Sequence, residues 1–476
     1  MDDAPADADL PGGGIRHLIR IGAPLVLASA GHAFRLFIDR VMLARYSPEA
    51  IAASMPAGML CFSLMAFFIG TTSYVNTFVA QYSGAGQRRE IGSAVWQGLY
   101  IAAIGGIVMA IISLESEAIF ALMGHAPEIQ AMEVPYFRVM SCLGFPSMAL
   151  SALNAFWSGR GRTRVVMAIE LLCAAVNVVL NAILIYGYAG MPEMGIVGAG
   201  IATSIASTCG ALLGAFLFLR PSNRMTYGTW PARTFNPVLF RRVIRFGLPN
   251  GLQLGLELLA FMVFIAVLGR LGSEELEAAN IAFGLNAMAF LPMLGLGVAV
   301  SVIVGQSVGA GNIPVAQRAV RSGFILAVLY NLAIGSAFLL APDAIISVFA
   351  RAGDAAQEAT LKMAKQCLFF VTAYLLFDAV YVVYSHAIKG AGDTRYALCA
   401  GILVSWGTLA LPTWIAIRGG ASFWTLWAIL VVHVFIAAAV FATRYFGGKW
   451  QGMRVIEAWG PESVIAEVDL QADRGI

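Results

Sequence analysis

The feature that most constrains this chain is a series of long apolar segments that runs almost from end to end. A helix needs about 20 apolar residues to cross a bilayer, whereas the strands of a membrane barrel are about half as long and alternate in polarity. Unbroken apolar segments of helical length therefore predict transmembrane helices rather than strands. We expect twelve of them, at 17–45, 51–80, 93–114, 134–157, 165–187, 195–219, 240–269, 277–306, 317–340, 362–388, 396–417 and 421–446.

The composition agrees with residence in a membrane. Hydrophobic residues make up 59% of the chain and charged residues only 12%, against roughly 25% charged residues in soluble proteins. The net charge of +3 is too small to indicate binding to nucleic acid. No P-loop, HExxH or GxSxG motif is present, so we expect neither an enzyme nor a cofactor.

The cysteines are expected to be small core residues. They lie in apolar stretches, without the CxxC spacing or the neighbouring histidines that a zinc site needs. The six are Cys61, Cys142, Cys173, Cys209, Cys367 and Cys399.

The polar parts of the chain divide it into regions. Residues 1–15 are acidic and rich in glycine and proline, and residues 447–476 are polar and acidic, so both are expected to be tails. A basic stretch at 220–240 reads as a linker between an N-terminal lobe, 16–219, and a C-terminal lobe, 241–446.

The basic residues of the short loops predict the orientation. Loops that face the cytoplasm carry an excess of Lys and Arg. Here the even-numbered connections hold Arg88, Arg89, Arg160, Arg162, Arg164, Arg220, Arg224, Arg233, Arg241, Arg242, Arg245, Arg318, Arg321, Lys389 and Arg395. The odd-numbered connections are acidic, with Glu115, Glu117, Glu128, Glu193, Glu274, Glu275, Asp343 and Asp354. Both termini and the linker are therefore expected in the cytoplasm.

An internal repeat relates the two halves. IRIGAP at 19–24 aligns with IRFGLP at 244–249, and the same offset of 225 places QYSGAG at 81–86 on QSVGAG at 306–311. The GRGRTR motif at 159–164 aligns with GAGDTR at 390–395. Because six helices return the chain to its starting side, the two lobes should share one orientation, related by a pseudo-two-fold axis along the membrane normal. We therefore expect an all-α membrane protein with a cleft between its lobes and alternating access, as in a transporter.

Four carboxylates lie deep in these apolar segments, where a charge costs at least about 2.5–3.5 kcal/mol unless it finds a partner, water or a proton. Two belong to the second half: Glu257, and Asp378, which follows Tyr374 by one helical turn. Together they could hold a small cation such as Na⁺ or share protons. The alternative is a pair of unrelated acids that are hydrogen-bonded to the protein.

Two further carboxylates lie in the first half. Asp39 follows Pro24, which can bend its helix, so Asp39 is a candidate for proton coupling. Arg35, one turn before Asp39, makes a simple ion pair the alternative. Glu170, Asn177 and Asn181 form one polar stripe, which either lines a hydrated cavity with Asp39 or makes interhelical hydrogen bonds. For His32 and His433 we favour a core role.

Several motifs, in order along 16–446, resemble the multidrug and toxic compound extrusion (MATE) family. They are Pro24 with Asp39, AQYSGAG followed by WQG, GRGRTR, VNVVLNAILIYG, GIVGAGIATSIA, GLPNGLQLGLE, VGQSVGAG and FDAVYVVYSHAIKGAGDTR. The resemblance implies a twelve-helix, two-lobed exporter of cationic or amphiphilic compounds in a bacterial inner membrane, driven by Na⁺ or H⁺. By motif, Glu257, Tyr374 and Asp378 resemble a second-lobe cation site. Asp39, Asn177 and Asn181 resemble a first-lobe coupling site.

Other functions remain open at this point. A lipid or lipid-linked oligosaccharide flippase of the same superfamily would need a cationic cavity, for which Arg35 and Arg40 are the candidates. A scaffold or receptor that does not transport would tolerate neutral replacements of the buried acids. Within a transporter, the two lobes complete the pathway in one chain, so a monomer is expected to function.

Overall fold

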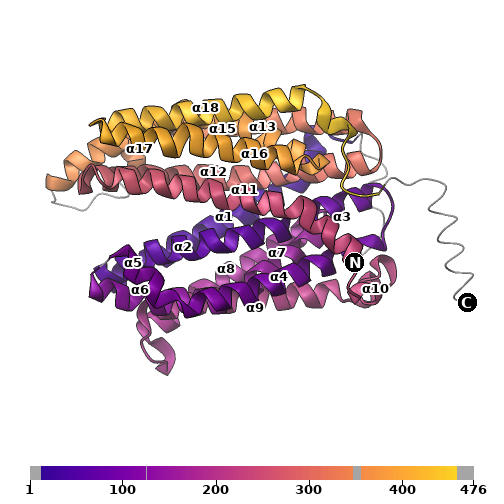
Figure 1. The fold of residues 1–476 in the computed structure, drawn as a ribbon, viewed down its shortest axis with the longest axis horizontal. Helices are drawn as coiled ribbons and strands as arrows, with labels where there is room; N and C mark the ends of the chain where they lie inside the picture. Colours follow the sequence, from indigo (N-terminus) through magenta and orange to yellow (C-terminus); the bar gives the residue numbers. More distant parts are fainter. Residues whose placement is uncertain (1–11, 125, 347–354, 458–476) are drawn as a thin grey trace, which may run out of the picture.

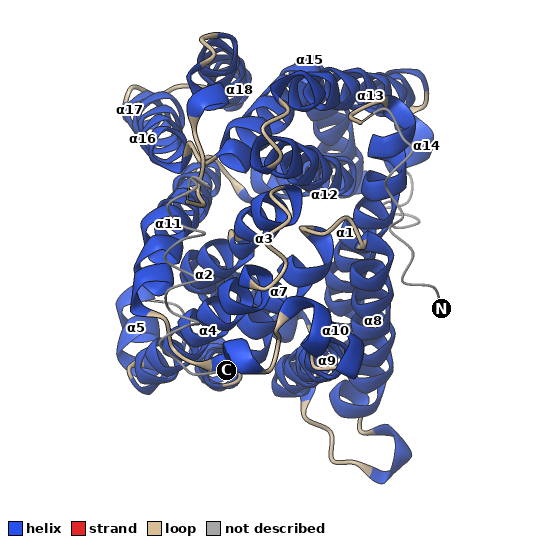
Figure 2. Ribbon diagram, turned by 90° about the vertical axis from the view of Figure 1, so that its right-hand side faces the viewer, coloured by secondary structure: helices blue, strands red, loops and turns tan. Residues whose placement is uncertain are grey.

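The computed structural model describes residues 12–124, 126–346 and 355–457. Within these ranges the chain forms helices and loops without a strand (Figure 2). The first half contains α1 (Ile15–Tyr46), α2 (Pro48–Ser73), α3 (Val75–Gly84), α4 (Glu90–Leu114), α5 (Ser116–Met123), α6 (Pro127–Cys142), α7 (Phe145–Ser158), α8 (Thr163–Tyr186), α9 (Gly195–Phe218) and α10 (Pro221–Tyr227). The second half contains α11 (Pro237–Leu268), α12 (Ser273–Gly309), α13 (Ile313–Leu340), α14 (Pro342–Ile346), α15 (Ala355–Ala391), α16 (Thr394–Val404), α17 (Leu411–Arg418) and α18 (Phe423–Phe446).

The structure agrees with the expected number of spans, with eleven unbroken ones in the described ranges and a twelfth when one bent helix pair is counted as a span. Eleven spans in the described ranges are long and apolar enough to cross a membrane, and the twelfth is the pair α6 and α7, bent by 41°. The bend has a local cause, since Pro146 cannot donate the backbone hydrogen bond that would continue α6 into α7.

The helices form two lobes (Figure 1). In the N-terminal lobe α8 packs between α1 and α9, and α2 and α7 pack against α4. In the C-terminal lobe α15 packs against α12, α13 and α18, while α16 packs against α11. The lobes meet where α2 contacts α11, α1 contacts α12, and α3 contacts α12. The expected all-α, two-lobed class is therefore confirmed.

Both described chain ends lie at one end of this bundle, the right-hand end in Figure 1, which also carries α10. We call this the terminal end and the opposite one the distal end. The loops after α3, α7, α12 and α15 lie at the terminal end, because the chain crosses the bundle an even number of times between each of these loops and the next. These loops contain the repeated motifs of the two halves.

The structure corrects two expected boundaries and one expectation about the cysteines. The linker is shorter than 220–240, because Asn236 caps α11 and that helix begins at Pro237. Residues 447–457 are folded rather than a tail, with Trp450 and Val455 each 1% exposed. Cys142 and Cys399 are exposed rather than in the core, and Cys209 is half-buried. The outer parts of both tails, 1–11 and 458–476, and Asp354 lie outside the described residues.

Candidate functional site

The first candidate site lies in the C-terminal lobe and is centred on Glu257 of α11. Gln253, one helical turn earlier, donates a hydrogen bond from Nε2 to Glu257 Oε1 at 2.9 Å. The hydroxyl of Tyr381 on α15 donates to the same carboxylate, with distances of 3.3 Å to Oε1 and 3.2 Å to Oε2. The carboxylate is thus held by neutral donors from two helices.

A close helix contact gives Glu257 its position. Gly401 of α16 lies so near that a Cβ atom there would overlap Glu257 Oε1 and come within 2.9 Å of Gln253 Cγ. Beyond α16 the helix widens into a π-helical turn, η4 (Ser405–Ala410). Trp406 in that turn donates from Nε1 to the carbonyl of Leu256 at 3.2 Å. Wide turns of this kind are frequent at functional sites.

Asp378 lies one turn before Tyr381 on α15, and its side chain is only 8% exposed. No side chain or backbone amide of the described residues donates a hydrogen bond to it. The phenol of Tyr381 lies within electrostatic range of both Asp378 and Glu257. Tyr381 therefore connects the two carboxylates that the sequence singles out.

Tyr374, one turn before Asp378, also lies within electrostatic range of that carboxylate. It is 3% exposed and packs in an apolar cluster with Leu375 and Phe264. It makes no hydrogen bond to Glu257 or Asp378 in the described structure. Tyr381 is the phenol that contacts a carboxylate, and a coupling role for Tyr374 stays a prediction.

The second candidate site lies in the N-terminal lobe, where a series of hydrogen bonds between side-chain amides ends at Asp39 of α1. Asn181 on α8 donates a hydrogen bond to Asp39 Oδ1 and also contacts Asn177 Oδ1 at 3.3 Å. Asn177 in turn donates to Thr203 Oγ1 of α9 at 3.1 Å. The structure therefore brings together Asp39, Asn177 and Asn181 as the sequence suggests.

Glu170 belongs to a neighbouring polar group in the same lobe. Asn154 of α7 donates to its Oε1 at 2.8 Å. The hydroxyl of Ser158, one turn further along α7, donates to the backbone carbonyl of Asn154 and to the side-chain oxygen of Asn76 on α3. Glu170 is therefore linked to α7 and α3, whereas Asp39 is linked to α9.

Arg35 lies between the two N-lobe carboxylates. It is 8% exposed, within electrostatic range of Asp39 and Glu170, and its guanidinium contacts His32 Nδ1 at 2.8 Å. Within the described ranges it makes no ion pair with Asp39 inside 4.0 Å. The simple intrahelical pair is therefore not formed. His433 contacts Thr408 Oγ1 at 2.9 Å, in agreement with a core role.

Helix α1 continues through Pro24 without a break between Ile15 and Tyr46. Pro24 cannot donate to the carbonyl of Arg20, so the helix lacks one hydrogen bond there. A bend at Pro24 stays a prediction.

Three amides that hold carboxylates share one feature. Gln253, Asn181 and Asn154 each donate through nitrogen to a carboxylate, and each has a buried side-chain oxygen that receives no hydrogen bond from the described residues. An acceptor in this state needs water, a protonated group or a cation. Carboxylate and amide oxygens are the donor types that suit a hard cation such as Na⁺. The described residues contain no group of three or more His, Cys, Asp or Glu side chains that could hold a metal ion.

Three polar residues of these lobes, Gln253, Tyr381 and Glu133, were not singled out from the sequence. Gln253 and Tyr381 have helical spacing to Glu257 and Asp378, which is the signal that could have found them. Glu133 of α6 is fully buried, but the expected span began one residue later, at 134.

A bundle of about twelve spans, in two repeated lobes with a buried carboxylate site in each, defines a multi-span membrane transporter rather than an enzyme. A family model, MatE, matches residues 24–183 and 249–414, most of both lobes. The chain therefore belongs to the MatE family of multidrug efflux transporters.

Individual relatives agree with this assignment. The chain is 29% identical to a probable multidrug resistance protein NorM of Pseudomonas putida, covering 93% of this chain and 96% of that one. It is 30% identical to the multidrug resistance protein PmpM of Pseudomonas aeruginosa, covering 90% and 91%.

The fold matches solved structures of the same kind. A MOP superfamily transporter from Pyrococcus furiosus superposes with a TM-score of 0.83 at 19% identity, covering 93% of this chain and 98% of that one. An outward-facing multidrug resistance MATE family transporter gives 0.82 at 19% identity, covering 91% and 95%.

Proposed function

We propose that this chain is a secondary antiporter that exports cationic or amphiphilic compounds in exchange for inward Na⁺ or H⁺, by alternating access of its two lobes. The observation that carries the proposal is the environment of Asp378. It is a nearly buried carboxylate in the membrane-spanning part of the C-terminal lobe, with no hydrogen-bond donor from the described residues. Such a group must bind a proton or a cation to lie there at an acceptable free energy.

Glu257 gives this site its second carboxylate. Each acid is unfavourable as a buried free charge, so a cation or a proton bound at either one lowers the free energy of the site. Lys389 of α15 lies within electrostatic range of Glu257. The unpartnered oxygen of Gln253 adds a neutral acceptor beside them. Na⁺ at Glu257 and Asp378, or a proton shared by them, would use the same residues. The N-lobe group at Asp39 offers a further place for coupling.

The orientation follows from charge. The terminal end carries the arginine-rich connections, and loops of this kind remain in the cytoplasm. We infer that both chain ends face the cytoplasm, and that the protein resides in a bacterial inner membrane. Because both lobes and both sites belong to one chain, a monomer suffices for transport.

The substrate class follows from the relatives and from the interior. Both relatives are named as multidrug resistance proteins. Carboxylates in the membrane-spanning interior attract organic cations, and apolar side chains accept their hydrophobic parts. A flippase for pyrophosphate-linked lipids would need a net positive interior. Arg35 is the buried N-lobe cation that favours it, but that residue lies beside both Asp39 and Glu170.

The test is ethidium efflux from liposomes that contain the purified protein, with a sodium gradient or a pH gradient imposed separately. We expect efflux under one gradient and its loss in Asp378→Asn and Glu257→Gln. The matched control is Asp343→Asn, because Asp343 is an exposed partner of Lys365 near the distal end. Equal efflux in all variants would overturn the coupling role. Absence of ethidium efflux together with scrambling of a pyrophosphate-linked lipid would favour the flippase.

A further inference from the structure

Gln81 of α3 joins the two lobes at the terminal end. Its side chain is fully buried, and Nε2 donates to the carbonyls of Gly390 at 3.1 Å and Ala391 at 3.2 Å. Both acceptors lie at the end of α15 in the C-terminal lobe. Nearby, the hydroxyl of Tyr74 donates to the carbonyl of Lys389 at 2.8 Å. The end of α15 is therefore tied to α3.

Gln306 makes the reciprocal contact. It occupies the position of α12 that the repeat aligns with Gln81, and its Nε2 donates to the carbonyl of Gly159 in the N-terminal lobe at 2.9 Å. Gly159 and Gly390 are aligned positions of the repeat as well. Each glutamine thus binds the loop motif of the opposite lobe.

Two glycines allow the lobes to approach this closely. A Cβ at Gly84 would overlap the backbone carbonyl of Gln306, and a Cβ at Gly309 would overlap the carbonyl of Gln81. We call the four residues Gln81, Gly84, Gln306 and Gly309 the glutamine clasp. Viewed onto the terminal end, α3 and α12 lie next to each other near the centre (Figure 2).

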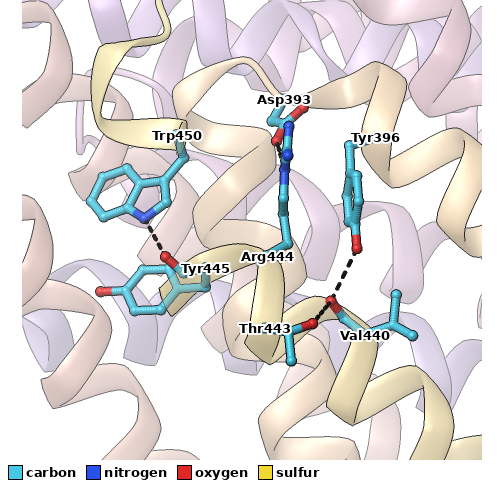
Figure 3. A network of polar contacts seen from close by, with 7 residues as sticks. All are labelled: Asp393, Tyr396, Val440, Thr443, Arg444, Tyr445 and Trp450. Carbon is cyan, nitrogen blue, oxygen red and sulfur yellow. Dashed lines mark hydrogen bonds and ion pairs between the residues drawn. The ribbon is translucent and has the colours of Figure 1, made fainter. Parts of the chain in front are cut away.

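The chain after α18 folds back onto this region. Residues 449–457, which we call the C-terminal strap, begin with the 3-10 turn η5 (Lys449–Gly452). Trp450 stacks on Tyr445, with ring centroids 5.3 Å apart, and donates from Nε1 to the Tyr445 carbonyl (Figure 3). An ion pair of 2.6 Å between Arg444 and Asp393 fixes the end of α18 beside the loop after α15.

The strap then reaches the clasp. The backbone amide of Val455 donates to Gln81 Oε1 at 2.9 Å, so the strap occupies the acceptor of the same amide whose nitrogen holds α15. Val455 also packs on Gly392, whose added Cβ would lie 3.0 Å from Val455 Cγ1. Gln306 has no such bond from the strap within the described residues. Among the described residues, the strap therefore binds Gln81 of the clasp and not its counterpart Gln306.

We propose that Gln81 is a positioning residue of the transport cycle and that the C-terminal strap is a latch on it. When the terminal end opens, the lobes must separate there, which breaks the bonds of Gln81 to Gly390 and Ala391. The strap orients the Gln81 amide for those bonds and so favours the state that is closed at the terminal end. This inference rests on the proposed alternating access. It adds that the protein's own C-terminal strap shifts the equilibrium between the states that are open and closed at the terminal end.

The test measures the two states directly, without transport. Spin labels at Arg164→Cys and Arg321→Cys, exposed positions on opposite lobes at the terminal end, report the separation of the lobes in a chain whose native cysteines are replaced. We expect mainly one short distance in the full chain. A chain that ends at Gly448 should show an increase in the open-to-closed ratio of about fivefold, the effect of losing about one net hydrogen bond. The matched control ends at Glu457 and keeps the strap, so its distances should equal those of the full chain.

A double-mutant cycle separates the latch from a general loss of stability. Gln81→Leu should shift the same ratio. Removal of the strap from Gln81→Leu should add little, because the bond from Val455 to Gln81 is already lost in that variant. Removal of the strap from Gln306→Leu should instead add its full effect. Unchanged distances in the folded chain ending at Gly448, or full additivity with Gln81→Leu, would overturn the proposal. Loss of gradient-driven efflux in the intact chain, with the distance shifts retained, would overturn antiport but leave the latch in place.

Discussion

Tyr381 donates to both carboxylate oxygens of Glu257, and the bond joins α15 to α11 within the C-terminal lobe. Because Tyr381 also lies one turn after Asp378, a change in the occupancy of either carboxylate acts on the same phenol. The proposed cation site therefore connects two helices, α11 and α15, and α15 ends at the glutamine clasp. If an ion binds there as proposed, this connection links its binding to the contact between the lobes.

The first prediction concerns that phenol. Tyr381→Phe removes the hydroxyl and leaves the ring, so Glu257 loses one of its two donors. A hydrogen bond to a charged group contributes about 1.5–3 kcal/mol, so we expect a loss of at least about tenfold in gradient-driven efflux or in apparent ion affinity. Tyr374→Phe is the comparison, because that hydroxyl lies within electrostatic range of Asp378 but donates a hydrogen bond to neither carboxylate. A larger defect in Tyr374→Phe than in Tyr381→Phe would contradict the site as described.

The second prediction uses the close approach of α16. Gly401→Ala places a methyl group against Glu257 Oε1, and the flexible carboxylate must move aside. We expect normal expression and thermal stability but efflux reduced to about 1% or less, roughly the effect of losing both donors to Glu257. Gly407→Ala, in the π-helical turn nearby, meets no atom within 4 Å and serves as control. Comparable efflux in the two alanine variants would show that the position of Glu257 is unimportant.

The sequence predicts both the positions of the helices and the identity of the buried acids, because both follow from the cost of placing a charge in an apolar segment. Charges are expensive in an apolar segment, so Glu257 and Asp378 stand out without any knowledge of packing. The choice between Tyr374 and Tyr381 is different, because both lie within one turn of Asp378. Only the rotation of α15 against α11 decides which phenol reaches Glu257, and that rotation is set by packing between distant parts of the chain.

The C-terminal strap shows a second limit. Trp450, Val455 and Ile456 are too few, and too close to charged neighbours, to show a periodic pattern. Their burial depends on a surface made by α18, the loop after α15, and Gln81 of the other lobe. By contrast, the repeat did place Gln81 and Gln306 at equivalent positions, although it gave no indication that each one binds the opposite lobe.

The third prediction tests the N-terminal lobe. Asn181→Ala removes the amide that donates to Asp39, leaving a carboxylate between α1 and α8 without that donor. If Asp39 takes part in coupling, efflux should fall about tenfold, as for loss of a hydrogen bond to a charged group. Asn280→Ala, an exposed position on α12, is the control. Efflux equal to that of the control would assign coupling to the C-terminal lobe alone.

The fourth prediction concerns stability at the terminal end. Arg444 pairs with Asp393 at 2.6 Å, and the two side chains are only 17% and 5% exposed. Arg444→Ala leaves Asp393 buried without its cation, which destabilises a protein by about 3–5 kcal/mol. We expect a clearly lower melting temperature in detergent, and partial recovery when Asp393→Asn is added, because the unpaired charge is then removed. Arg138→Ala breaks the exposed pair with Glu117, which is 76% exposed, so its effect should stay below about 1 kcal/mol. Equal melting temperatures for Arg444→Ala and Arg138→Ala would mean that the buried pair does not hold α18, and with it the start of the strap, in place.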